Sequence, residues 1–93
     1  MDDIVIDTHI AIWYFGDLTQ LSKPAENAID NAEANGFIYV SAITLVELIY
    51  LTEKGRIPNN VLDLLRVAID DSTTAFKLFE ITREVANVVE DIP

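Results

Sequence analysis

Two acidic residues occupy positions at which a small sheet could build a metal site. Asp7 directly follows the apolar run Ile4–Ile6, and Glu47 lies shortly after a second apolar run at 37–40. Short runs rich in β-branched side chains are typical of buried strands in a parallel sheet. In such sheets ligands bind beyond the carboxyl ends of the strands, so both carboxylates reach one crevice if the strands are neighbours. Carboxylate oxygens suit hard divalent cations, which usually bind through one or two of them plus water and phosphate.

Each of these acids also has a purely structural interpretation. Asp7 can serve as a turn or N-cap residue after the strand. Thr44 and Glu47 fit the spacing of a capping box, in which the glutamate side chain bonds the backbone N–H of the cap residue. Spacing alone favours the capping box for Glu47. For Asp7 it does not decide between a helix cap and a metal ligand.

The single histidine and an aromatic run lie close behind the first acid. His9 could act as a general base or a metal ligand, but the chain has no cysteine and no second histidine, which favours a surface or core histidine. The run at 13–15, Trp-Tyr-Phe, could stack on nucleic-acid bases. A cluster of this kind is more often part of a core or an interface. The acids Asp2, Asp3, Asp70 and Asp71 are expected to be solvated.

Strands and helices alternate along the chain. Strands separated by helices indicate a parallel sheet with right-handed crossovers, and no repeat, low-complexity tract or linker interrupts the pattern. We therefore expect one α/β unit, a three-layer α/β/α fold with a parallel sheet. The expected elements are strands at 4–6, 37–40 and 75–81, a short helix at 9–15, helices starting at Ser22, at Ser41 or Thr44, and at Pro58, and a last helix capped by Thr82.

Composition and charge limit the function. The chain carries 16 acidic and 6 basic residues, a net charge of −10. Nucleic-acid binders gain most of their affinity by neutralising phosphates, so this charge counts against a nuclease unless metal ions or a separate basic surface offset it. The lack of cysteine excludes disulfides and thiolate metal sites. The acidic amino terminus is unlike a secretory signal and the longest apolar run, 10–15, is too short for a membrane span, so we expect a cytoplasmic protein.

Two stretches together resemble a known family. Residues 4–9, Ile-Val-Ile-Asp-Thr-His, resemble the opening strand of PIN domains, where an aspartate followed by Thr or Ser begins the active site. Residues 38–48 resemble the second strand and next helix of VapC-type toxins, where a Ser-x-x-Thr/Ser-x-x-Glu pattern delivers the second metal ligand. Residues 54–57 are similar to the turn that usually follows. The pair of motifs, in this order and separation, resembles a PIN-domain ribonuclease toxin of the VapC type.

The resemblance implies a metal-dependent endoribonuclease, a hydrolase that cuts single-stranded RNA with a metal-activated water. Asp7 and Glu47 would be the catalytic residues and hold Mg²⁺ or Mn²⁺, while Thr8, Thr44 and Ser41 would orient ligands or waters. It also implies a cognate antitoxin whose segment enters the acidic groove, and a homodimer formed through apolar helices. The net charge of −10 suits a basic antitoxin peptide better than it suits RNA.

PIN domains typically continue with another acidic helix and one or two more strands, and nothing up to Pro93 matches these. Asp91 comes too early for that motif. We therefore expect residues 1–93 to be a single partial PIN-like domain, truncated before the C-terminal strand or strands. Such a chain would bind its ion weakly, in the millimolar range, and be inactive or nearly so unless another chain completes the site. The alternative is a non-catalytic, degenerate PIN module that binds antitoxin or an intact partner.

Overall fold

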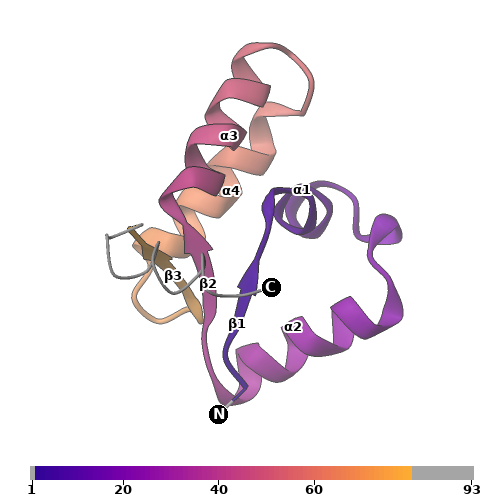
Figure 1. Ribbon diagram of the computed structural model, residues 1–93, viewed down its shortest axis with the longest axis vertical. Coiled ribbons are helices and arrows are strands. Elements are labelled where there is room, and N and C mark those ends of the chain that lie inside the picture. Colours follow the sequence, from indigo (N-terminus) through magenta and orange to yellow (C-terminus); the bar gives the residue numbers. More distant parts are fainter. Residues whose placement is uncertain (1, 81–93) are drawn as a thin grey trace, which may run out of the picture.

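The computed structural model describes residues 2–80. Within them a parallel sheet of three strands, in the order β1-β2-β3, is combined with four α-helices (Figure 1). Figure 1 shows α3 and α4 extending together beyond the sheet, while α2 runs past the other end of β1. No helix in this part of the chain is long and apolar enough to cross a membrane. The elements are β1 (Ile4–Ile6), α1 (Thr8–Gly16), the 3-10 helix η1 (Leu18–Gln20), α2 (Lys23–Asn35), β2 (Ile38–Ser41), α3 (Ala42–Glu53), α4 (Asn59–Asp70) and β3 (Phe76–Phe79).

This order confirms the α/β fold with a parallel sheet. The short helix η1 was not expected from the sequence, and the helix expected from Thr82 lies outside the described residues. The strands follow one another in a single direction across the sheet, and right-handed crossovers then bring the connecting helices to the same face.

One hydrophobic core joins the helices to one face of the sheet. The register sets Ile38 between Ile4 and Phe76, and these side chains alternate with Val5, which is 65% exposed on the opposite face. Burying each large aliphatic side chain contributes about 1.5–3 kcal/mol, so this face supplies most of the stability. The buried residues of this core are Ile6, Ala11, Ile29, Ala32, Ile38, Val40, Leu48, Val61, Leu62, Leu65 and Phe76.

The helices that follow β1 and β2 begin almost directly where these strands end. Asp7 is the N-cap of α1, and its Oδ1 accepts a hydrogen bond from the Ile10 N–H at 2.9 Å. Ser41 ends β2 and also caps α3, its Oγ accepting from the Thr44 N–H at 3.1 Å. Ser22 caps α2 in the same way. Side-chain oxygens accept hydrogen bonds from free N–H groups in the first turn of each helix. The strand and the helix can therefore follow each other directly, without a connecting loop.

Two of the acids that were expected to be solvated also accept structural hydrogen bonds. Asp3 Oδ1 accepts from the Phe37 N–H at 2.8 Å and so joins the starts of β1 and β2. A Cβ at Gly36 would lie 2.5 Å from this same oxygen, which explains the glycine. Asp71 Oδ1 accepts from the side chain and the N–H of Thr73, and these bonds, the side-chain one first, lower the pKa of Asp71. Asp3 and Asp71 are both exposed, as expected, and each also accepts hydrogen bonds that hold the local structure.

Candidate active site

The carboxyl ends of β1 and β2 form one edge of the sheet. Parallel pairing sets Ile6 opposite Val40, so Asp7 and Ser41, the next residue of each strand, lie at the same level. Helix α3 starts immediately after Ser41 and carries Glu47 in its second turn. This is the edge at which open parallel sheets bind ligands. The strands that carry the two candidate acids are neighbours, which is the condition under which both acids reach one crevice.

A hydrogen bond between the two chain segments fixes Glu47 at this edge. Thr8 Oγ1 donates to Glu47 Oε2 at 3.1 Å, across 39 residues of sequence. Thr8 is 8% exposed, whereas both Asp7 and Glu47 are exposed. Since Thr8 follows Asp7 directly, the bond holds Glu47 beside the junction that carries the other acid. Among residues 2–80, one oxygen of each carboxylate accepts a hydrogen bond and the other accepts none.

The capping-box interpretation of Glu47 was wrong. Ser41, not Thr44, caps α3, and Glu47 lies too far along the helix to reach the backbone N–H of its cap. Thr44 is buried, and its hydroxyl accepts from Ser41 Oγ at 3.3 Å. Ser41 and Thr44 thus bond each other, while Thr8 contacts an acid directly. Roles for these three hydroxyls around an ion remain predictions.

The arrangement fits a divalent cation that keeps part of its water shell. Two exposed carboxylates, Asp7 and Glu47, meet the demand of Mg²⁺ or Mn²⁺ for oxygen ligands and leave room for water and phosphate. Among residues 2–80 no group of three or more His, Cys, Asp or Glu side chains could hold a metal. The donor set is therefore that of an open site and not of a closed protein cage.

A model of the PIN domain family matches residues 4–93, almost the whole chain. The chain belongs to the PIN domain family. This PIN domain is similar to Ribonuclease VapC22 of Mycobacterium tuberculosis (strain ATCC 25618 / H37Rv), with 35% identity over 57 residues. These residues are 61% of the chain and 42% of the relative, so the chain spans less than half the length of the curated relative it matches. No solved structure matches significantly. The VapC-type resemblance is thereby confirmed.

Glu80 of this PIN domain was not singled out from the sequence. It follows β3 directly, at the same edge of the sheet, and lines a hollow of about 430 Å³ together with Glu47 and with Ala42, Ile43 and Val46. An acid placed immediately after the third apolar run was the signal that could have found it. The strand order puts Glu80 on the other side of β2 from Asp7, which explains why the three acids do not form one group.

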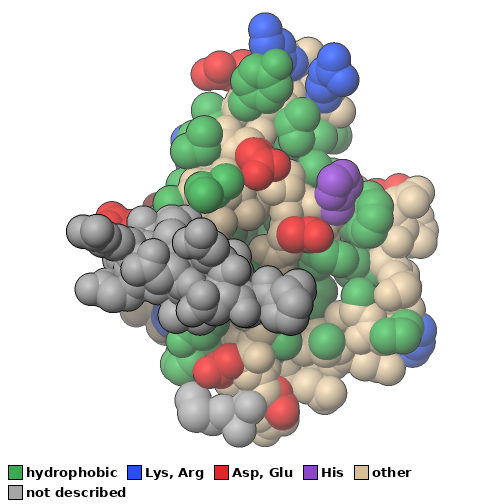
Figure 2. All heavy atoms as spheres, in the orientation of Figure 1, with side chains coloured by type: hydrophobic (Ala, Val, Ile, Leu, Met, Phe, Trp, Pro, Cys, Tyr) green, Lys and Arg blue, Asp and Glu red, His purple; other side chains and the backbone are tan. Residues whose placement is uncertain are grey.

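The aromatic run on α1 divides between the core and the surface. The rings of Tyr14 and Phe15 pack on Phe76, with centroids 5.7 and 5.3 Å apart, as expected for a core cluster. Trp13 is half-buried and is not among the described side chains that pack on the core. It pairs instead with His9, at 5.9 Å between centroids and 50° between ring planes. His9 is exposed, as the surface interpretation predicted, and Figure 2 shows the chain's one histidine on the same face as acidic side chains.

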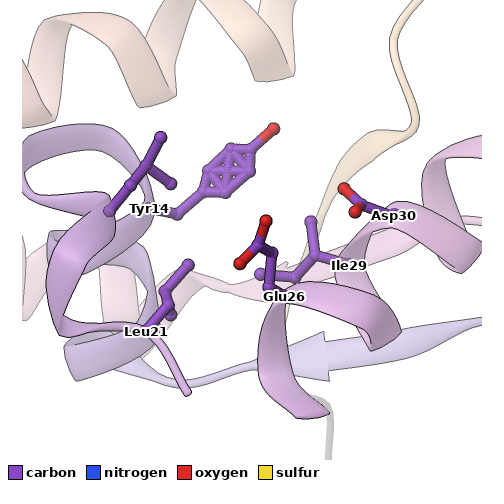
Figure 3. Close-up of a pocket in the computed structure, with 6 residues that line it drawn as sticks. Tyr14, Leu21, Glu26, Ile29 and Asp30 are labelled. Carbon is purple, nitrogen blue, oxygen red and sulfur yellow. The ribbon is translucent and has the colours of Figure 1, made fainter. Parts of the chain in front are cut away.

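A separate hollow of about 170 Å³ lies between α1, η1 and α2 in the PIN domain (Figure 3). The ring of Tyr14 and the carboxylates of Glu26 and Asp30 face it from the two helices. The Tyr14 hydroxyl donates to Glu33, and burial, followed by this bond, raises the pKa of Tyr14. The hollow is lined by Tyr14, Leu18, Leu21, Glu26, Ile29 and Asp30, so it does not include the acids of the sheet edge.

Proposed function

We propose that this PIN domain belongs to a metal-dependent, single-strand ribonuclease toxin of a toxin–antitoxin pair. The observation that carries the proposal is the Thr8–Glu47 hydrogen bond, which fastens the second acid beside Asp7 at the ligand-binding edge of the sheet. The similarity to a protein named Ribonuclease VapC22 supports RNA cleavage as the chemistry. We further propose that the protein acts in the cytoplasm.

Asp7 and Glu47 would hold the ion, which supplies an activated water and offsets negative charge at the phosphate. Thr8 keeps Glu47 in place through its hydroxyl, because one carboxylate oxygen is fixed by the bond and the side chain loses rotational freedom. The Ile10 N–H does the same for Asp7 Oδ1. Both acids are thus held in position at the site. With two such acids among residues 2–80, we expect weak ion binding and slow or no RNA cleavage.

The partners we propose are a cognate antitoxin and a second copy of this chain. A net charge of −10 attracts a basic peptide and repels RNA, so a basic antitoxin segment is the better competitor for the acidic edge. Ile43, Val46 and Tyr50 are spaced along one side of α3 and are 54%, 64% and 56% exposed. An apolar helix surface of this kind supports the homodimer.

A metal titration followed by an RNA cleavage assay tests the proposal. We expect millimolar Mn²⁺ binding by the chain, lost in both Asp7→Asn and Glu47→Gln, and any cleavage of a single-stranded oligoribonucleotide to need the ion and both acids. Glu53→Gln, at the end of the same helix, is the matched control and leaves Mn²⁺ binding unchanged. Mn²⁺ binding that persists in Asp7→Asn and Glu47→Gln would contradict the proposed site.

A second candidate is a non-catalytic PIN module that binds antitoxin or an intact partner. It is favoured by the lack of a three-acid group within residues 2–80. The same assays separate the two. Binding of a basic antitoxin peptide, together with no cleavage at saturating Mn²⁺, would support the module, whereas metal-dependent cleavage that Glu47→Gln abolishes would support the enzyme.

A further inference from the structure

We propose that His9 and Trp13 form a stacking surface for a base of the single-stranded RNA, next to Asp7 and Glu47. The inference rests on the proposed ribonuclease function and adds the contact that positions the strand. Neither residue holds the ion in this scheme. They bind a base, while the two acids act at the phosphate.

The core does not use Trp13. Its neighbours Ile12, Tyr14 and Phe15 all pack against the core, yet Trp13, the largest side chain of the helix, is not among the described side chains that do so. It remains half-buried and contacts His9. An indole offers more flat apolar surface than any other side chain, and leaving it partly in water costs stability unless a ligand covers it. The exposed part of the Trp13 indole is the surface that a base would cover.

The position of the pair along α1 places it at the acidic edge. His9 lies two residues after Asp7 and one after Thr8, which contacts Glu47. Trp13 is one helical turn further, about 6 Å along the axis, on the same side of the helix as His9. The two rings thus extend from the acid pair along α1. Figure 2 shows the histidine projecting from the face that also carries acidic side chains.

Charge explains why a ribonuclease of this composition needs such a surface. The net charge of −10 opposes phosphate binding, and Figure 2 shows acidic side chains close to the histidine. Bases are uncharged, and every base has a flat face that can stack on an aromatic ring whatever its sequence. Stacking on His9 and Trp13 therefore supplies affinity that electrostatics cannot give near the acids.

The single tryptophan of the chain makes a direct test possible. The double variant Asp7→Asn/Glu47→Gln cannot cut the RNA and repels it less, so it is titrated with a labelled single-stranded oligoribonucleotide. Anisotropy of the label reports binding, and emission of the protein reports Trp13. We expect the Trp13 emission to be quenched, and the RNA concentration at half-quenching to equal the concentration at half-maximal anisotropy change. A rise in anisotropy with unchanged emission would overturn the stacking proposal and leave the ribonuclease proposal intact.

Variants then assign the contact to the two rings. In the same background, Trp13→Ala and His9→Ala should each weaken RNA binding by about 5-fold or more, the loss expected for one stacked base, whereas Trp13→Phe and His9→Phe should retain it. Tyr39→Ala is the control, because Tyr39 is a half-buried aromatic on the opposite face of the sheet. Far-ultraviolet circular dichroism checks that each variant folds.

Other outcomes are equally clear. Equal RNA affinity of the Ala and Phe variants would refute the role of the rings. If the Ala variants bind a basic antitoxin peptide more weakly but bind RNA as before, the surface belongs to a protein partner and the proposal fails. If RNA binds neither the double variant nor the wild type with Mn²⁺, the stacking proposal fails. The Mn²⁺ titration of Asp7 and Glu47 needs no RNA, so it judges the proposed metal site independently.

Discussion

Thr8→Val tests the contact on which the proposed site depends. Valine nearly matches threonine in size, so the substitution removes the hydroxyl that donates to Glu47 at 3.1 Å and leaves the buried packing in place. A hydrogen bond to a charged group contributes about 1.5–3 kcal/mol. Glu47 is exposed and regains water, so we expect the free energy of unfolding to fall by less, about 1 kcal/mol. Partners that orient a metal ligand typically change affinity 10- to 100-fold, and re-solvation favours the lower limit, about tenfold weaker Mn²⁺ binding.

Two assays measure these effects, urea unfolding for stability and isothermal titration for Mn²⁺. Thr8→Ser keeps the hydroxyl and should retain both properties. Thr52→Val is the matched control, because Thr52 Oγ1 donates to the Leu48 carbonyl at 2.7 Å in the same helix, α3, away from the acids. We expect it to alter stability only. Unchanged Mn²⁺ affinity in Thr8→Val, while Glu47→Gln abolishes binding, would show that the hydrogen bond does not position the ligand.

Three further predictions concern stability. The raised pKa of Tyr14 means that its stabilising contribution is present below the ordinary tyrosine pKa, about 10, and is lost as pH rises through the higher native value. Tyr14→Phe should therefore reduce the loss of unfolding free energy at alkaline pH, as measured by urea unfolding. Gly55 has φ of 68°, so Gly55→Ala should cost about 1–2 kcal/mol by thermal unfolding, with Gly55→Asn costing less. Ser41→Ala removes the cap of α3 and should lower the unfolding free energy by about 1 kcal/mol, while equal stability would refute the cap.

Local signals in the sequence predicted the elements well. The strand Ile4–Ile6 and the helix capped by Ser22 and ended before Gly36 lie where expected, because β-branched runs, caps and glycine act on their immediate neighbours. The strand expected at 37–40 is shifted by one residue, to Ile38–Ser41. This shift matters, since Ser41 then ends the strand and starts the next helix, which removes Thr44 from the cap position.

The contacts of the site could not be predicted in the same way. The bond from Thr8 to Glu47 depends on how α1 and α3 pack, and a capping box is an equally good local explanation of the same spacing. In the run at 13–15 all three aromatics suit a core, and only the rotation of the packed helix, about 100° per residue, separates Trp13 from Tyr14 and Phe15.

No loop separates β2 from α3, so the position of Glu47 relative to the sheet is fixed by the length of the chain between them. The last residue of the strand is also the cap of the helix, and the Asp7 junction has a single residue between strand and helix. Adding or deleting one residue at either joint would turn the following helix by about 100°, a change that no loop is present to absorb. The length of the chain at these joints is thus as much a requirement of the chemistry as the acids themselves.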